Sequence, residues 1–133
     1  MTHHEVLFGS MEWLEAYVKL FNENKIVKEG LKDLTAKVAY EFTDRPDIIP
    51  KYAFIENGTI NDFGEVSDES TMDYVIRANY DTWKVMTLGE LDPMNALMSG
   101  KVKVTGNMAA LLKHAEGFKQ TFDVVEAIPT AFD

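Results

Sequence analysis

The chain has 133 residues, of which 46% are hydrophobic and 26% charged, and its formal net charge is −9. This composition is typical of one globular domain over residues 1–133 and excludes a disordered chain. The acidic excess argues against a nucleic-acid partner, because phosphate backbones repel it. The absence of cysteine excludes disulfides, thiolate catalysis and cysteine metal sites.

Neither a secretion signal nor a membrane span is visible in the sequence. The first ten residues lack a basic stretch followed by a long apolar run. No window approaches the ~20 consecutive apolar residues that a bilayer span needs. We therefore expect a cytoplasmic protein without stable membrane insertion, and we expect residues 1–9 to be flexible.

The first third of the chain has the apolar spacing of helices. Ser10 is a good N-cap, so the first helix should begin there. A second helix is expected from Asn24 to Leu34, weakened slightly by Gly30. The apolar stripe of the first helix consists of Trp13, Leu14, Tyr17, Val18 and Phe21.

Strand patterns follow, and the strongest turn signal of the chain lies among them. Asn57-Gly58 readily adopts positive φ, which favours a tight hairpin between the flanking strands. Two prolines indicate a loop over 44–50. The expected strands are Ala36–Phe42, Lys51–Glu56, Thr59–Glu65 and Met72–Ala78.

Short helices dominate the second half. Asp81 should cap a helix that stops at Gly89, and Asp92-Pro93 should start another that ends at Gly100. An alternating strand over Lys101–Thr105 precedes a last helix that begins near Met108. Together the elements predict an α+β fold: a mainly antiparallel sheet of about five strands, covered on one face by about five helices.

Catalytic and metal-binding motifs are scarce. His114 is the only histidine in mid-chain, and it lacks the partners that catalysis or metal binding needs. Gly100-Lys101 fails the phosphate-loop pattern, since position 95 is Asn and position 102 is Val. Acidic pairs such as Glu65 with Asp68 show no sign of burial. We expect no enzyme activity, no bound metal and no cofactor.

Four of the seven methionines lie between residues 86 and 108. Methionine fills irregular spaces and suits surfaces that accept varied ligands. Stripes at helical spacing usually pack against a sheet, however, so the pattern alone favours ordinary core. The methionines are Met86, Met94, Met98 and Met108.

The residue order between 83 and 107 resembles the lipid-binding domain of the sterol carrier protein type two family. In that family a Trp- or Phe-bearing helix leads to a Gly-x-x-Asp-Pro helix start, a Ser-Gly-Lys turn, a Lys-x-Lys strand and a Gly-Asp turn. Asn107 stands where the family usually has Asp. The residues that carry the resemblance are Trp83-Lys84, Leu88-Gly89-Glu90, Leu91-Asp92-Pro93, Ala96, Met98-Ser99-Gly100-Lys101, Val102, Val104 and Gly106-Asn107.

This resemblance implies an apolar tunnel between sheet and helices. Family members carry fatty acids, fatty acyl-CoA, phospholipids or sterols without altering them. A mobile segment over 118–132 could then gate the tunnel. The implied tunnel wall consists of Trp83, Met86, Leu91, Met94, Met98, Val102, Val104, Leu111, Leu112, Phe118 and Phe122.

An alternative stays open from the sequence alone. The same apolar residues could fill the core of a protein-interaction module, or form the interface of a homodimer. Both readings predict a protein without catalysis, and they differ in whether the interior holds space for a ligand.

Overall fold

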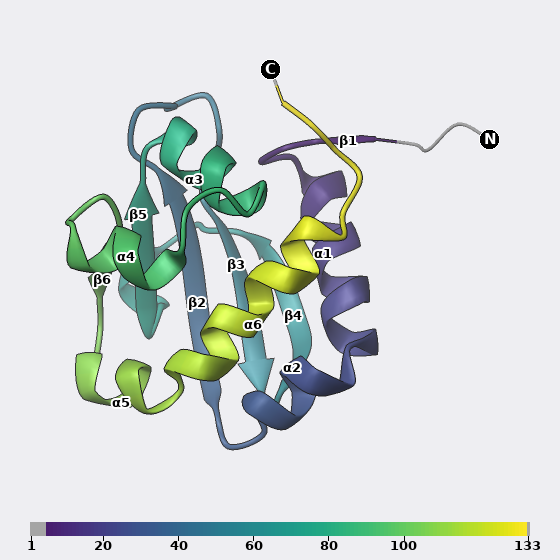
Figure 1. Ribbon diagram of the computed structural model, residues 1–133, viewed down its shortest axis with the longest axis vertical. Coiled ribbons are helices and arrows are strands. Elements are labelled where there is room, and N and C mark those ends of the chain that lie inside the picture. The colour runs from purple at the N-terminus through teal and green to yellow at the C-terminus, as the bar shows by residue number, and fades with distance from the viewer. Residues whose placement is uncertain (1–4, 133) are drawn as a thin grey trace.

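The computed structural model describes residues 5–132 (Figure 1). All of its α-helices except the last begin at a side chain that accepts a backbone N–H, as at Ser10, whose Oγ accepts from Trp13 N at 3.2 Å. The helices are α1 (Met11–Glu23), α2 (Lys25–Gly30), α3 (Tyr80–Thr87), α4 (Pro93–Met98), α5 (Met108–Lys113) and α6 (Ala115–Glu126), with a 3-10 turn, η1, at Glu69–Thr71.

Three helix boundaries differ from the predictions. Asn79 caps α3 in place of Asp81, because its side chain accepts from Thr82 N at 2.8 Å. The second helix ends at Gly30, four residues before the expected end at Leu34. The expected last helix is divided at His114, where the backbone leaves helical geometry between α5 and α6.

The main sheet has the order β4-β3-β2-β5-β6. Three of its four pairings are antiparallel and the β2–β5 pairing is parallel, which confirms the prediction of a mainly antiparallel sheet. A crossover through η1 links β4 to β5 at the far side of β2. The strands are β2 (Thr35–Phe42), β3 (Lys51–Glu56), β4 (Thr59–Glu65), β5 (Tyr74–Ala78) and β6 (Lys103–Thr105).

The hairpin between β3 and β4 lies where the sequence predicts it. Asn57 and Gly58 have φ values of 51° and 80°. A Cβ at Gly58 would lie 2.4 Å from the carbonyl oxygen of Lys28, so glycine is required there by space as well as by conformation. This turn therefore holds the hairpin close against α2.

Helices cover one face of the sheet, and α6 crosses that face obliquely (Figure 1). α1 packs on β4 and on α6, and α2 packs on α6. The α2–α6 contact is close because Gly30 and Gly117 face each other; a Cβ on Gly117 would lie 2.7 Å from the Gly30 carbonyl. The expected α+β architecture with helices on one face is confirmed.

Two short segments near the ends of the described chain pair with each other, while the flexibility of residues 1–9 and a mobile gate over 118–132 stay predictions. Strand β1 (Val6–Leu7) pairs in parallel with β7 (Thr130–Ala131). Phe8 is buried and packs edge-on against Trp13. Residues 1–4 lie outside the described residues. Apolar side chains on both terminal segments explain the packing: Val6 and Ile128 belong to the buried core.

Candidate functional site

Among residues 5–132, buried apolar side chains form two clusters with a cavity between them. One cluster lies under α1, α2 and α6, and the other under α3 and α4. Trp13, Tyr40, Ile76 and Val104 pack against both clusters, and all four line the cavity. They stay partly exposed although they lie between layers, because the cavity leaves part of their surface without contacts.

The floor of the cavity is one row of the sheet. Register places Lys51, Tyr40, Ile76 and Val104 side by side on β3, β2, β5 and β6. The alternation of a strand turns these four side chains toward the helices. The roof comes from α1, α3, α4, α5 and α6, and the cavity volume is about 130 Å³.

Nine of the eleven predicted wall residues line this cavity. Leu91 and Met98 do not. Leu91 packs partly buried against the α3–α4 cluster, and Met98 is 83% exposed at the end of α4, where the chain enters an exposed turn. The nine are Trp83, Met86, Met94, Val102, Val104, Leu111, Leu112, Phe118 and Phe122. Their role in binding a ligand stays a prediction.

The sequence reasoning missed the N-terminal wall. Trp13, Leu14 and Tyr17 of α1, and Tyr40 and Phe42 of β2, also line the cavity. Their apolar spacing was visible, but spacing indicates only that a side chain faces inward. The resemblance is carried by residues 83–107, so it pointed only to the C-terminal half.

Two tyrosine rings meet in the cavity wall. Tyr17 and Tyr40 pack edge to face with their ring centroids 6.4 Å apart, and both line the cavity. Burial raises the pKa of Tyr40 to about 12 and the pKa of Tyr17 well above its ordinary value. Both hydroxyls are therefore neutral at any physiological pH and add no charge to the cavity wall.

The charged side chains that line the cavity are two lysines, Lys51 and Lys119. Lys51 Nζ donates to the Ile49 carbonyl at 2.5 Å and lies 4.0 Å from a Glu65 carboxylate oxygen. Burial lowers the pKa of Lys51, and Glu65 partly offsets this effect. Lys119 lines the cavity from α6, and its exposed ammonium lies 3.8 Å from Asp92. The other lining residues are uncharged and mostly apolar, so the cavity favours apolar ligand groups.

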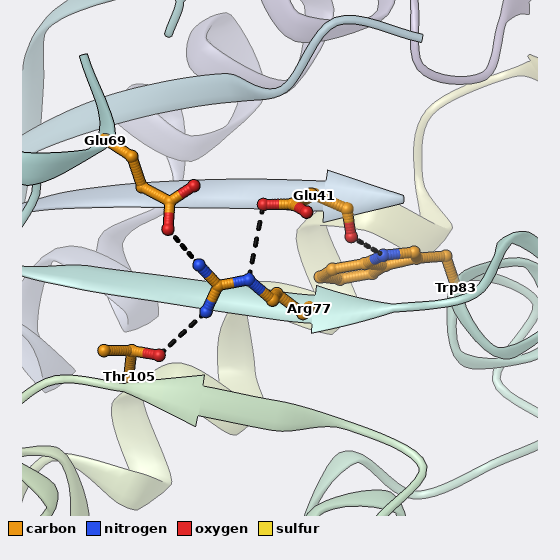
Figure 2. Close-up of polar contacts among 5 residues, drawn as sticks. All are labelled: Glu41, Glu69, Arg77, Trp83 and Thr105. Atoms are coloured by element: carbon orange, nitrogen blue, oxygen red, sulfur yellow. Dashed lines mark hydrogen bonds and ion pairs between the residues drawn. The ribbon is translucent and has the colours of Figure 1, made fainter. Parts of the chain in front are cut away.

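A network of hydrogen bonds and ion pairs on the opposite face of the sheet joins the strands that lie under the cavity (Figure 2). Arg77 of β5 binds Glu41 of β2 at 3.4 Å, Thr105 of β6 at 2.8 Å, and Glu69. The indole N–H of Trp83 donates to the Glu41 carbonyl at 2.9 Å. The indole that lines the cavity is thus held by the same strand that the arginine anchors.

Groups suited to metal chemistry are not assembled in the part of the chain that the structure describes. Within residues 5–132, no set of three or more His, Asp or Glu side chains gathers as metal ligands would. His114 Nδ1 lies 3.0 Å from the Ala110 carbonyl at the α5–α6 junction. No helix in residues 5–132 has the length and apolar content to cross a bilayer.

Comparison with known families decides what kind of domain surrounds this cavity. The sequence model of the SCP-2 sterol transfer family matches residues 14–119. The chain belongs to the SCP-2 sterol transfer family. The resemblance found in the sequence is thereby confirmed, and the matched range contains most of the cavity wall, from Leu14 through Lys119.

Solved structures share the SCP-2 fold of this chain. A crystal structure of sterol carrier protein 2 superposes with a TM-score of 0.83 at 23% identity, covering 91% of this chain and 98% of its own. A conserved hypothetical protein from Thermus thermophilus, described as a candidate sterol carrier protein, gives 0.82 at 23% identity, covering 98% and 94%. Palmitated SCP2L2 from Aedes aegypti gives 0.53 at 12%, covering 89% and 98%. No curated protein matches the chain.

Proposed function

We propose that this protein binds a lipid in the cavity between its two apolar clusters and carries it without chemical change. The observation that carries the proposal is that the cavity divides the core, with Tyr40, Ile76 and Val104 contacting both clusters across it. A filled interaction module would close such a space, because protein interiors pack to crystal density. Membership of the SCP-2 sterol transfer family also supports lipid binding.

The cavity favours a single acyl chain as ligand. Its volume of about 130 Å³ is below the usual ~300–1,000 Å³ of small-molecule pockets. A flexible chain can enter such a narrow space in steps as Met86 and Met94 move, since methionine side chains adapt easily. A rigid sterol would need the whole space at once. A palmitated relative among the similar structures supports the same ligand class.

Carriage without catalysis follows from the groups that reach the cavity. The Tyr17 and Tyr40 hydroxyls are held neutral by burial, so neither provides a nucleophile or base near neutral pH. Lys51 and Lys119 each have a carboxylate within 4.0 Å. The driving force is then transfer of hydrocarbon out of water, about 0.8 kcal/mol per methylene.

Native mass spectrometry of freshly purified protein, followed by lipid extraction, tests the proposal. We expect a co-purifying mass of fatty-acid size in the wild type. Ala115→Trp, which fills the cavity from the start of α6, should lose this mass. Ala127→Trp is the matched control, because Ala127 is exposed at the other end of α6 and should keep the ligand.

Two outcomes would refute lipid carriage. One is a clean apo mass that also fails to take up any added fatty acid. The other is a ligand that Ala115→Trp retains as well as the control does. A clean apo mass combined with a stable dimer would favour the interaction module instead.

A further inference from the structure

Exposed apolar side chains gather where α4 and α5 border the cavity. Met98 is 83% exposed at the end of α4, and Leu112 and Met108 of α5 are 54% and 38% exposed. Leu112 also lines the cavity, as do Met94 and Leu97 of α4. Exposed apolar side chains and cavity-lining side chains therefore occur together on α4 and α5, and the two helices flank β6 at one edge of the molecule (Figure 1).

The charge of this segment is opposite to that of the chain. Residues 93–115 contain three lysines and no Asp or Glu, although the whole chain has a net charge of −9. Lys101 and Lys113 are exposed next to the apolar side chains. Among residues 5–132 these two lysines form no salt bridge, whereas Lys32, Lys51 and Lys119 each lie within 4.0 Å of a carboxylate.

We propose that this surface, which we call the mouth face and define as Met98, Lys101, Met108, Leu112 and Lys113, docks on an anionic lipid bilayer. The proposal rests on the proposed function, because docking matters only if the cavity takes lipid. Apolar side chains would enter the interface while the lysines contact anionic headgroups. The cavity mouth would then face the bilayer, so an acyl chain could pass without crossing water.

A second copy of the chain fits this surface poorly. A two-fold dimer places the same patch of both subunits together, so the unpaired lysines of the two copies would meet. Three apolar side chains on two short helices also make a small contact compared with the roughly 1,200–2,000 Å² that stable protein interfaces bury. An anionic bilayer instead complements both the charge and the exposed apolar groups.

The experiment measures co-sedimentation of the full chain with vesicles of phosphatidylcholine, with and without phosphatidylglycerol. We expect binding to the anionic vesicles that weakens with added salt, and much less binding to phosphatidylcholine alone. Met98→Ser/Lys101→Gln should weaken anionic-vesicle binding about tenfold, since each lysine near such a surface contributes roughly fivefold. Met108→Ser/Lys113→Gln should act similarly.

A matched control removes one exposed apolar side chain and one lysine elsewhere. Ile26 is 65% exposed on α2 and Lys28 is exposed beside it, away from the cavity. Ile26→Ser/Lys28→Gln should leave vesicle binding within about twofold of wild type, since charge near the bilayer matters only within a Debye length. Light scattering of each variant without vesicles reports the oligomeric state.

Solution binding of a fluorescent fatty acid separates the two proposals. Wild type and both mouth-face variants should bind it equally, because Met98, Lys101, Met108 and Lys113 do not line the cavity. Failure of the wild type to bind it would refute lipid carriage itself. Three results, each with normal fatty-acid binding, would overturn the docking surface alone. The first is no vesicle binding by the wild type, and the second is equal vesicle binding by the mouth-face and control variants. The third is a dimer that Met98→Ser/Lys101→Gln dissociates.

Discussion

The two halves of the helical layer differ in how they pack on the same sheet. Under α1 and α2 the core is solid: Phe21, Val27, Leu31, Val38 and Ile55 have no exposed surface. Under α4 and α5, apolar side chains are left half-buried around a cavity. The second half therefore keeps internal space while the filled first half supplies stability.

The largest expected effect is a difference in the free energy of unfolding between two phenylalanine-to-alanine variants. Phe21→Ala should lower the free energy of unfolding by about 3–5 kcal/mol, because it opens a void in a filled core. Phe118→Ala should cost less than half as much, since its ring already borders the cavity. Denaturant titration of both variants measures the difference, and equal losses would show that the two halves pack alike.

The next largest expected effect is a loss of stability at alkaline pH that is caused by the buried Tyr40. The pKa of Tyr40 is raised by burial to about 12, above the ordinary value of 10.0. The unfolded chain therefore releases this proton first. Stability from Tyr40 is complete below pH 10 and is lost as the pH rises toward 12, by about 2–3 kcal/mol. Tyr40→Phe should show a correspondingly shallower decline between pH 9 and 12, and an unchanged slope would place the hydroxyl in water.

The smallest expected effect lies in the cavity wall. Met94→Ala should lower the free energy of unfolding by about 1 kcal/mol or less, below the ~2–5 kcal/mol typical of a filled core. The side chain is only partly buried and faces existing space, so no new cavity is created. A loss above ~2 kcal/mol in denaturant titration would mean that Met94 is part of a filled core.

The sequence predicts those parts of the fold that depend on local chemistry. The β3–β4 hairpin is predicted to the residue, because Asn57-Gly58 admits positive φ and the flanking strands alternate. The pairing of β1 with β7 is not predictable in this way. Each strand has two residues, and their partners lie at opposite ends of the chain, so no local pattern marks them.

The cavity could be predicted only through the family resemblance. Tyr17 and Phe21 lie on the same apolar face of α1, yet Tyr17 borders the cavity and Phe21 is fully buried in the solid cluster. The periodicity of apolar residues indicates that both side chains face inward, but it does not distinguish a side chain that borders a cavity from one in a filled core. Met98 is the opposite case: it continues the apolar stripe of α4, which predicts burial, but its side chain is exposed.

Calorimetric titration with saturated fatty acids of increasing length tests the central claim most directly. If hydrocarbon enters the cavity, each added methylene should strengthen binding about fourfold until the space is full, and Ala115→Trp should end this gain at a shorter chain. Affinity that does not depend on chain length, or no binding by the wild type at any length, would contradict the account.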